Sequence, residues 1–166
     1  KTGTTSTQLR GAALVTGNLR LTSGTFTVSV GTHTMAVGGD LLLDGGSLNT
    51  SSVGTLEVAG DVVHTGTTVS SGMPTIRFGG DWTGNGSTFA PTGGLAVSTG
   101  TGATLSGAAL RFATLQIAAG ASTTASSDLT VTQDLVVDGA MSANGTSTSV
   151  GVDLTVNGSL GGAANL

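Results

Sequence analysis

The sequence has no cysteine and no tyrosine, and it contains one tryptophan, one lysine and one glutamate among 166 residues. The absence of cysteine excludes a disulfide scaffold and a cysteine-based zinc site. The strong helix formers Glu, Lys, Gln and Met are scarce, which argues against a helical protein. No apolar run reaches the roughly 18 residues that a transmembrane helix needs. We therefore expect no membrane insertion.

Charge is the second deficiency. Charged residues make up 8% of the chain and the net charge is −4, whereas an ordinary globular domain has about 25% charged residues. The five basic residues are too few to neutralise a phosphate backbone, so we expect no nucleic-acid partner. The hydrophobic fraction of 37% is too high for a charged disordered chain. Because no residue type here needs a reducing compartment, the composition favours a secreted protein.

What the sequence does have is 29 glycines, 30 threonines and an internal repeat. Seven residues with the pattern Thr, apolar, variable, apolar, small, Gly, Asp occur at 34–40, 55–61 and 75–81. Apolar and polar residues alternate around each Asp with a period of two, which is the pattern of short strands with one buried face. A unit of about 20 residues with short strands and tight turns matches one coil of a β-solenoid and is too short for a propeller blade.

The phase of this repeat extends along most of the chain. Its anchor positions are 18, 40, 61, 81, 94, 114, 134 and 153, so the intervals between them are 22, 21, 20, 13, 20, 20 and 19. The short interval, between anchors 81 and 94, contains Pro91. It indicates either a shortened or distorted coil or an error of alignment at that point.

These observations predict an all-β fold, a single parallel β-solenoid of about eight coils of ~20 residues that forms one domain over 1–166. We expect the regular coils at about 9–160, between a short polar N-terminal segment, 1–8, and a C-terminal tail, 161–166. Equivalent positions in successive coils should lie above one another at the strand spacing and form ladders. One inward core ladder is expected to contain Leu19, Leu41, Val62, Trp82, Leu95, Leu115, Leu135 and Leu154.

Two stretches of the chain, 76–89 and 97–107, followed by Phe112 and 115–117, resemble repeats of large bacterial surface proteins. These are adhesin-like and autotransporter-passenger-like chains. The resemblance covers most of 17–160, and its motifs are structural. It implies a right-handed parallel β-helix that serves as a rigid stalk, a surface layer or an adhesive rod. It also implies a location outside the cell or on its surface.

Most acidic residues precede a strand at the recurrent turn. At such a turn an Asp side chain accepts backbone N–H groups, and this structural role is the one we expect. One alternative is that Asp40, Asp61 and Asp81 form a vertical carboxylate ladder that binds Ca²⁺, since stacked carboxylates would otherwise repel one another. Apart from this calcium we expect no cofactor. A catalytic carboxylate pair, as in a polysaccharide lyase, is a further alternative.

Histidine and tryptophan are few enough to consider one by one. His33 and His64 fall at different phases of the coil, so they are not expected to meet. His64 occupies an inward position and is expected to be a buried or edge polar residue. Trp82 is expected to fill a wider coil of the core, and the alternative is a partly exposed platform for sugar stacking. Arg77 is expected beside Glu57, because the two positions differ by one repeat.

Threonine raises a separate question, because flat solenoid faces that carry Thr-x-Thr pairs can order water and bind ice. Such a face needs its pairs at one phase in every coil. The candidate pairs begin at 25, 32, 65, 99, 130 and 146, and they fall at six different distances from their anchors. We therefore expect these residues to reflect β propensity and side-chain ladders rather than an ice-binding face.

The two ends carry the functional expectation. No polar capping element of the kind that protects terminal solenoid coils is visible in the sequence. Open ends expose unpaired strand edges, and two explanations fit them. Either the chain is a fragment of a longer solenoid, or it assembles end to end, since heterologous head-to-tail contacts generate fibres. We expect a noncatalytic structural protein whose partner is a second copy of itself, stacked end to end in an extracellular filament or stalk. The alternative is an adhesin module that binds a surface or a carbohydrate, such as a surface polysaccharide.

Overall fold

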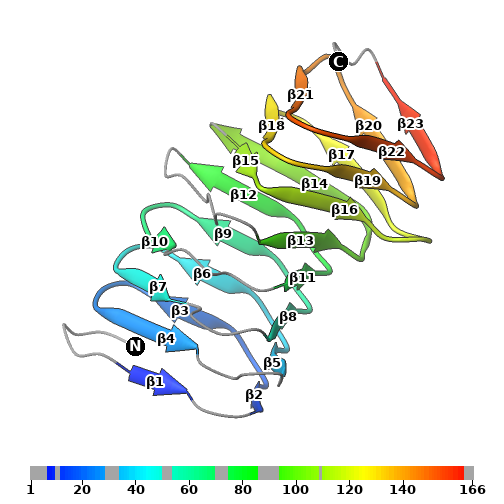
Figure 1. Cartoon of the computed structure of the whole chain (residues 1–166). Coiled ribbons are helices and arrows are strands. Elements are labelled where there is room, and N and C mark those ends of the chain that lie inside the picture. The colour runs from blue at the N-terminus through cyan, green and yellow to red at the C-terminus, as the bar shows by residue number, and fades with distance from the viewer. Residues whose placement is uncertain are drawn as a thin grey trace.

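The computed structural model describes residues 7–9, 12–28, 34–49, 54–69, 75–85, 94–108 and 110–162. In these ranges the regular structure is entirely β-strand, and every strand pair is parallel. Figure 1 shows the strands stacked in layers from one end of the molecule to the other. The expected all-β parallel solenoid is thus confirmed, whereas its handedness and its number of coils stay predictions.

Successive strands pass from a first sheet to a second sheet and then to a third side. Sheet 1 contains β2 (Ala13–Val15), β5 (Thr34–Val37), β8 (Thr55–Val58), β11 (Thr75–Phe78), β13 (Leu95–Ser98), β16 (Thr114–Ile117), β19 (Leu135–Val137) and β22 (Leu154–Val156). Sheet 2 contains β3 (Leu19–Leu21), β6 (Leu41–Leu43), β9 (Val62–His64), β12 (Trp82–Asn85), β14 (Thr101–Ala108), β17 (Ser122–Ala125), β20 (Ala140–Ala143) and β23 (Ser159–Gly161).

The third side is divided between two shorter sheets. Sheet 3, in the N-terminal half, contains β1 (Thr7–Leu9), β4 (Thr25–Val28), β7 (Ser47–Asn49) and β10 (Thr68–Val69). Sheet 4, in the C-terminal half, contains β15 (Leu110–Phe112), β18 (Leu129–Val131) and β21 (Thr148–Val150). The strands therefore run slightly beyond the bounds of 9 and 160 that the sequence indicated.

The core is a narrow column between these sides. In most strands the apolar residues at alternate positions point inward and are buried, as in β5, where Met35 and Val37 are each 1% exposed. Parallel sheets favour β-branched and aliphatic side chains at such positions. The column is richest in aromatic residues near its middle, where the Trp82 ring packs edge-on against Phe78 and Phe112 with ring centroids 5.1 Å apart in both pairs. Trp82 is 1% exposed, as expected for a core residue.

The residues of the expected inward ladder do not form one column, because most of them are divided between a column in sheet 2 and a column in sheet 1. Its first four members, from Leu19 to Trp82, are in register in sheet 2, and the column continues from Trp82 to Leu105. Its last three members, Leu115, Leu135 and Leu154, are in register in sheet 1.

Leu95 belongs to neither of these columns. It pairs with Thr75 and Thr114, and the residue in register with Leu115 is Ala96.

The short interval between anchors 81 and 94 arises because the anchors change from one sheet to another at this point. The anchors up to 81 precede strands of sheet 2, whereas those from 94 onward precede or begin strands of sheet 1. Both kinds of strand begin with an apolar, variable, apolar sequence after a polar or glycine corner, so the pattern alone does not distinguish them. In the structure the coil is not shortened here, because Ile76 is in register with Ala96 and Trp82 is in register with Leu105.

The buried hydroxyl groups of the described core are hydrogen-bonded, with one exception. The hydroxyls of Ser98 in sheet 1 and Thr123 in sheet 2 share a hydrogen bond of 2.8 Å across the interior, and both residues are buried. The Thr148 hydroxyl is buried as well, and it has no hydrogen-bond partner among the described residues. A buried hydroxyl without a partner costs about 1–3 kcal/mol.

This contrast predicts opposite effects for the same substitution at two sites. Thr148→Val removes an unpaired hydroxyl and should raise the free energy of unfolding by about 1 kcal/mol. Thr123→Val removes one partner of a buried pair, leaves Ser98 unsatisfied and should lower it by about 1–2 kcal/mol. Urea denaturation of the two variants beside the parent chain measures both values. Equal effects of the same sign would contradict this account of the core.

Candidate functional site

The corner between sheets 1 and 2 holds the recurrent Gly-Asp motif. The backbone N–H of Asp61 donates to Asp40 Oδ1 at 3.0 Å, and that of Asp81 donates to Asp61 Oδ1 at 2.8 Å. The chain of contacts begins at Asn18, whose Oδ1 accepts from the Asp40 N–H at 2.9 Å, and it ends at Thr104, whose N–H donates to Asp81. Each side chain thus ties its own coil to the next. The expected role as an acceptor of backbone N–H groups is confirmed for these three acids, but the N–H belongs to the next coil and not to the turn of the Asp itself.

The glycine before each Asp is required by the same contact. A Cβ on Gly60 would lie 2.3 Å from Asp40 Oδ1, and one on Gly80 would lie 2.1 Å from Asp61 Oδ1 and 2.8 Å from the Gly60 backbone. Backbone atoms do not move aside for a methyl group as the end of a flexible side chain does. The two-residue motif is therefore one structural unit. The Asp carboxylate accepts an N–H from the next coil, and the Gly of that coil leaves space for the carboxylate.

The calcium alternative for Asp40, Asp61 and Asp81 is not supported by this geometry. One oxygen of each carboxylate already accepts a backbone N–H from the next coil. Among the residues that the structure describes, no three His, Asp or Glu side chains come close enough together to hold a metal ion. The repulsion between stacked carboxylates is offset here by backbone donors and by the Asn18 side-chain amide, which donates to Asp40 Oδ2 at 3.1 Å.

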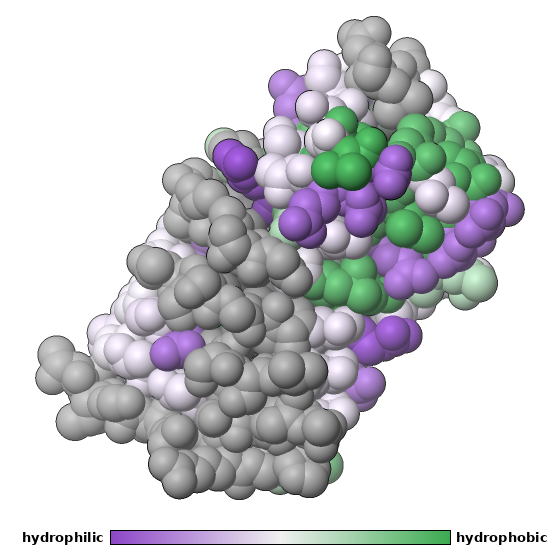
Figure 2. Space-filling model, viewed as in Figure 1, coloured by the Kyte–Doolittle hydropathy of each residue, from purple (hydrophilic) through white to green (hydrophobic). Residues whose placement is uncertain are grey.

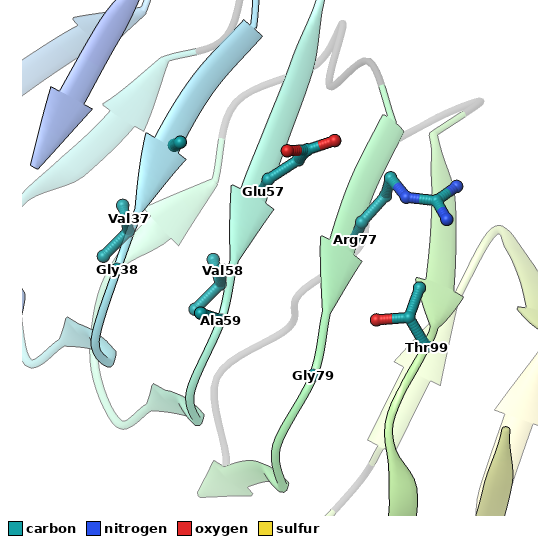
Figure 3. Close-up of a pocket in the computed structure, with 9 residues that line it drawn as sticks. Val37, Gly38, Glu57, Val58, Ala59, Arg77, Gly79 and Thr99 are labelled. Atoms are coloured by element: carbon teal, nitrogen blue, oxygen red, sulfur yellow. The ribbon is translucent and has the colours of Figure 1, made fainter. Parts of the chain in front are cut away.

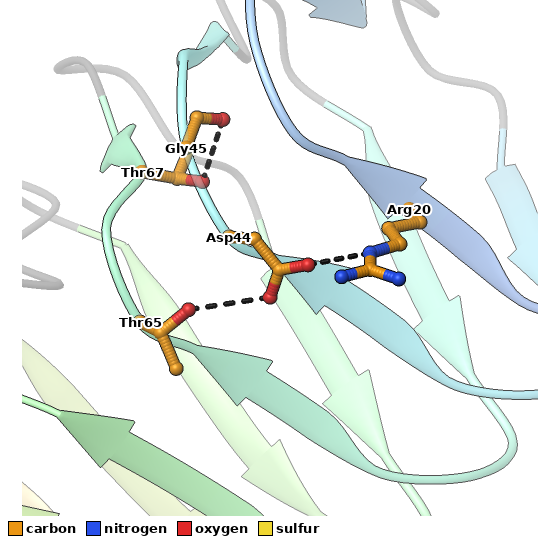
Figure 4. Close-up of polar contacts among 5 residues, drawn as sticks. All are labelled: Arg20, Asp44, Gly45, Thr65 and Thr67. Carbon is orange, nitrogen blue, oxygen red and sulfur yellow. Dashed lines mark hydrogen bonds and ion pairs between the residues drawn. The ribbon is translucent and has the colours of Figure 1, made fainter. Parts of the chain in front are cut away.

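A second polar chain crosses the corner that follows sheet 2 (Figure 4). The Arg20 guanidinium donates to Asp44 Oδ2 and forms an ion pair with it, while the Thr65 hydroxyl donates to Asp44 Oδ1 at 3.2 Å. Thr67, nearby, donates to the Gly45 carbonyl at 3.0 Å. These contacts join residues 21 to 24 positions apart in sequence. They are a structural network between coils, because every group in them is engaged by a neighbouring coil.

A third chain lies at the corner between sheets 1 and 2 in the C-terminal half. Asp138 accepts from the Asn157 amide at 2.8 Å through Oδ1 and from the Gln116 amide at 2.6 Å through Oδ2. These hydrogen bonds, first that of Asn157 and then that of Gln116, hold the pKa of the Asp138 carboxyl below its ordinary value. Asp138 is therefore ionised at neutral pH and bonded on both oxygens, which suits a structural clamp across three coils.

His64 lies at the inward position that the sequence indicated. Its side chain is fully buried, and Nε2 lies 2.5 Å from the Thr67 carbonyl oxygen, so this nitrogen carries the proton. Burial lowers the pKa of His64 below 6.5, and the backbone contact opposes that shift only in part. Burial thus favours the neutral form of the imidazole in the folded protein. His33 lies outside the described residues.

A groove on the outer face of sheet 1 is lined by residues of both charges, Glu57 and Arg77 (Figure 3). It is shallow, about 430 Å³ in volume, and spans β5, β8 and β11 with the corners that follow them. Glu57 and Arg77 stand on adjacent strands in register, as expected, beside Thr99. Small residues form much of the remaining lining: Ala36, Gly38, Ala59 and Gly79. The arrangement offers a carboxylate and a guanidinium above a floor without bulky side chains.

The remaining candidates are not brought together. Trp82 is too deeply buried to serve as a platform for sugar stacking. The described Thr-x-Thr pairs fall on different parts of the coil, since Thr25 and Thr27 lie in β4 of sheet 3, Thr65 follows β9 of sheet 2 and Thr99 follows β13 of sheet 1. Thr148 points inward from β21, and Thr32 lies outside the described residues. They do not build one flat face.

No protein-family model matches the chain, and no match was found among curated proteins or solved structures. The described residues contain no helix long and apolar enough to cross a membrane. The β-solenoid repeat fold implied by the resemblance to bacterial surface proteins is present in the structure.

The corner ladder predicts how substitutions of Asp61 differ. Asp61→Asn keeps the oxygen that accepts the Asp81 N–H, as Asn18 does naturally, and should leave the free energy of unfolding nearly unchanged. Asp61→Ala removes that acceptor and should lower it by about 1 kcal/mol. Denaturation of both variants with calcium and with a chelator tests this. A calcium-dependent gain in stability that Asp61→Asn abolishes would contradict the structural role.

The buried imidazole predicts a loss of stability in mild acid. The pKa of His64 is lower in the folded than in the unfolded chain, so the unfolded chain binds more protons as the pH falls below about 6.5. The contribution of His64 is fully present above that pH and is lost below it, by at most about 1.4 kcal/mol per pH unit. Denaturation at pH 7.5, 6.5 and 5.5 measures the loss. His64→Leu should flatten the profile, and an equally steep profile in this variant would assign the effect to other groups.

Proposed function

We propose that the chain is a noncatalytic structural protein of the bacterial cell exterior, a β-solenoid subunit that stacks end to end into an extracellular filament or stalk. The observation that carries the proposal is the loss of burial at the last strand of sheet 1. Leu154 and Val156 in β22 occupy the same inward columns as Leu135 and Val137 in β19. The two residues of β19 are 0% exposed, whereas Leu154 is 39% and Val156 is 42% exposed.

The C-terminal coil therefore presents core side chains to solvent. Val152, in the corner before β22, is 67% exposed as well. Figure 2 shows apolar residues gathered over the end of the molecule where Figure 1 places β22 and β23. Each of these two strands pairs on one side only with another described strand, so within the described residues its other edge is unpaired. Free edges together with exposed apolar residues favour association with another strand.

At the N-terminal end, inward side chains are also less buried than their equivalents in the next coil, but the difference is smaller. Ala13 and Leu19 are only partly buried, whereas Met35 and Leu41, which pair with them in the next coil, are 1% and 0% exposed. Most inward side chains of the terminal strands are thus less buried than those that have a coil on both sides, although Leu21 in β3 and Thr148 in β21 are 3% and 2% exposed. A second copy of the chain supplies such a coil at each end.

The bacterial and extracellular parts of the proposal rest on the sequence. They are supported by the resemblance of the repeats to adhesin-like and autotransporter-passenger-like chains, and by the absence of cysteine. The noncatalytic part is supported by the corner acids, because Asp40, Asp61, Asp81 and Asp138 are bonded between coils rather than directed into a shared cleft.

An adhesin module that binds a surface polysaccharide is the second candidate. The groove beside Glu57 and Arg77 favours it, because a guanidinium binds carboxylates and a carboxylate accepts hydroxyl hydrogen bonds. The floor of small residues leaves room for a flat ring. Loss of polysaccharide binding in Arg77→Ala, with the rod intact, would favour this candidate over the filament.

Assembly through the ends predicts a dependence of length on concentration. Electron microscopy and sedimentation of the chain should show rods of constant width that lengthen as concentration rises. A double variant, Leu154→Asp with Val156→Asp, should shorten them, because it places charge where the next coil would pack. Thr155→Asp is the matched control, since this residue lies between the two and points outward. Short rods of one length at every concentration would refute the proposal.

A further inference from the structure

We infer that the contact between copies is parallel and head-to-tail, and that β22 of one copy pairs in register with β2 of the next. This inference rests on the proposed function, for which it names the two surfaces and the register. Leu154 would lie beside Ala13 of the next copy, and Val156 beside Val15. On the outer face of the same sheet, Thr155 would lie beside Leu14.

The register follows from columns that run the length of sheet 1. In-register pairs connect Ala13 to Leu154 through every intervening strand. The same strands connect Leu14 to Thr155 and Val15 to Val156. The first and last strands therefore present equivalent positions of one repeat. Stacking β2 on β22 continues each column by one step.

The fit of side chains at this contact has a precedent inside the molecule. Ala13 between Leu154 and Met35 would repeat the arrangement of Ala96, which lies between Ile76 and Leu115 in the same column. There the alanine is 3% exposed, and the two large neighbours are 1% and 0% exposed. A small residue between two large ones is thus compatible with complete burial in this column.

A symmetric contact between two C-terminal ends lacks such a precedent. A two-fold axis across the solenoid would set β22 antiparallel to its copy, whereas every pair within the described chain is parallel. It would also reverse the order of the three sides, so that sheet 2 of one copy faced sheet 4 of the other. No column would then continue across the contact. The heterologous contact keeps all sides aligned, and contacts of this kind do not close on themselves.

The absence of cysteine from the chain allows a direct test. In-register residues on adjacent parallel strands are about 4.8 Å apart, which lies within the ~4.4–6.8 Å between Cα atoms that a disulfide accepts. Leu14→Cys and Thr155→Cys both lie on the outer face of sheet 1, where they disturb no core packing. Mixed in equal amounts under mild oxidation, the two single variants should yield a disulfide-linked heterodimer that neither yields alone.

The controls separate this inference from the proposed function. Val136→Cys is matched to Thr155→Cys, because it lies in the same outward column one strand further inside, and it should not cross-link to Leu14→Cys. A homodimer of Thr155→Cys alone would establish the symmetric contact and overturn the inference. Rods that lengthen with concentration but give no heterodimer would overturn the register while leaving end-to-end assembly in place. A protein that stays a single short rod would overturn both.

Discussion

Backbone hydrogen bonds between equivalent positions of successive coils are the interaction on which the rest of this structure depends. They run from one coil to the next, as where the Leu41 N–H donates to the Asp61 carbonyl and the Val62 N–H to that of Asp81. Because each strand pairs with its own equivalent, every side chain meets the same position of the neighbouring coil. Residues that tolerate their own copies, such as Thr, Val and Leu, are therefore favoured. Several of the few charged residues, among them Asp44 and Asp61, are bonded to a neighbouring coil.

The corners show how the few charged residues are accommodated. The carboxylates of Asp61 and Asp138 are both hydrogen-bonded to neighbouring coils, but by different donors. Asp61 accepts a backbone N–H from the next coil, and Asp138 accepts from amide side chains of the coils on both sides. Asp44 adds a cation and a hydroxyl, from Arg20 and Thr65. In each case hydrogen bonds from a neighbouring coil to the carboxylate offset its repulsion from other carboxylates. Acidic residues that suggest metal or catalytic chemistry in the sequence thus act as ties between layers.

The fold could be predicted from the sequence because the repeat is both periodic and alternating, and an alternation with so short a period has few other solutions. The assignment of strands to sheets could not, since Leu41 in sheet 2 and Leu115 in sheet 1 begin the same local pattern. The role of Asp61 was foreseeable from its turn position. The Arg20–Asp44–Thr65 chain was not, because its unequal spacings of 24 and 21 positions reflect corners of unequal length.

The same pairing rule governs the interior and the proposed assembly, since a coil that ends without a neighbour exposes the groups that a neighbour would cover. The most direct test of the account is an NMR measurement of scalar couplings across hydrogen bonds in the chain. We predict a coupling between the Leu41 amide nitrogen and the Asp61 carbonyl carbon, and another between Val62 and Asp81. Couplings that instead join β5 to β6, or any strand to its immediate successor as in a hairpin, would contradict the parallel coil-on-coil arrangement.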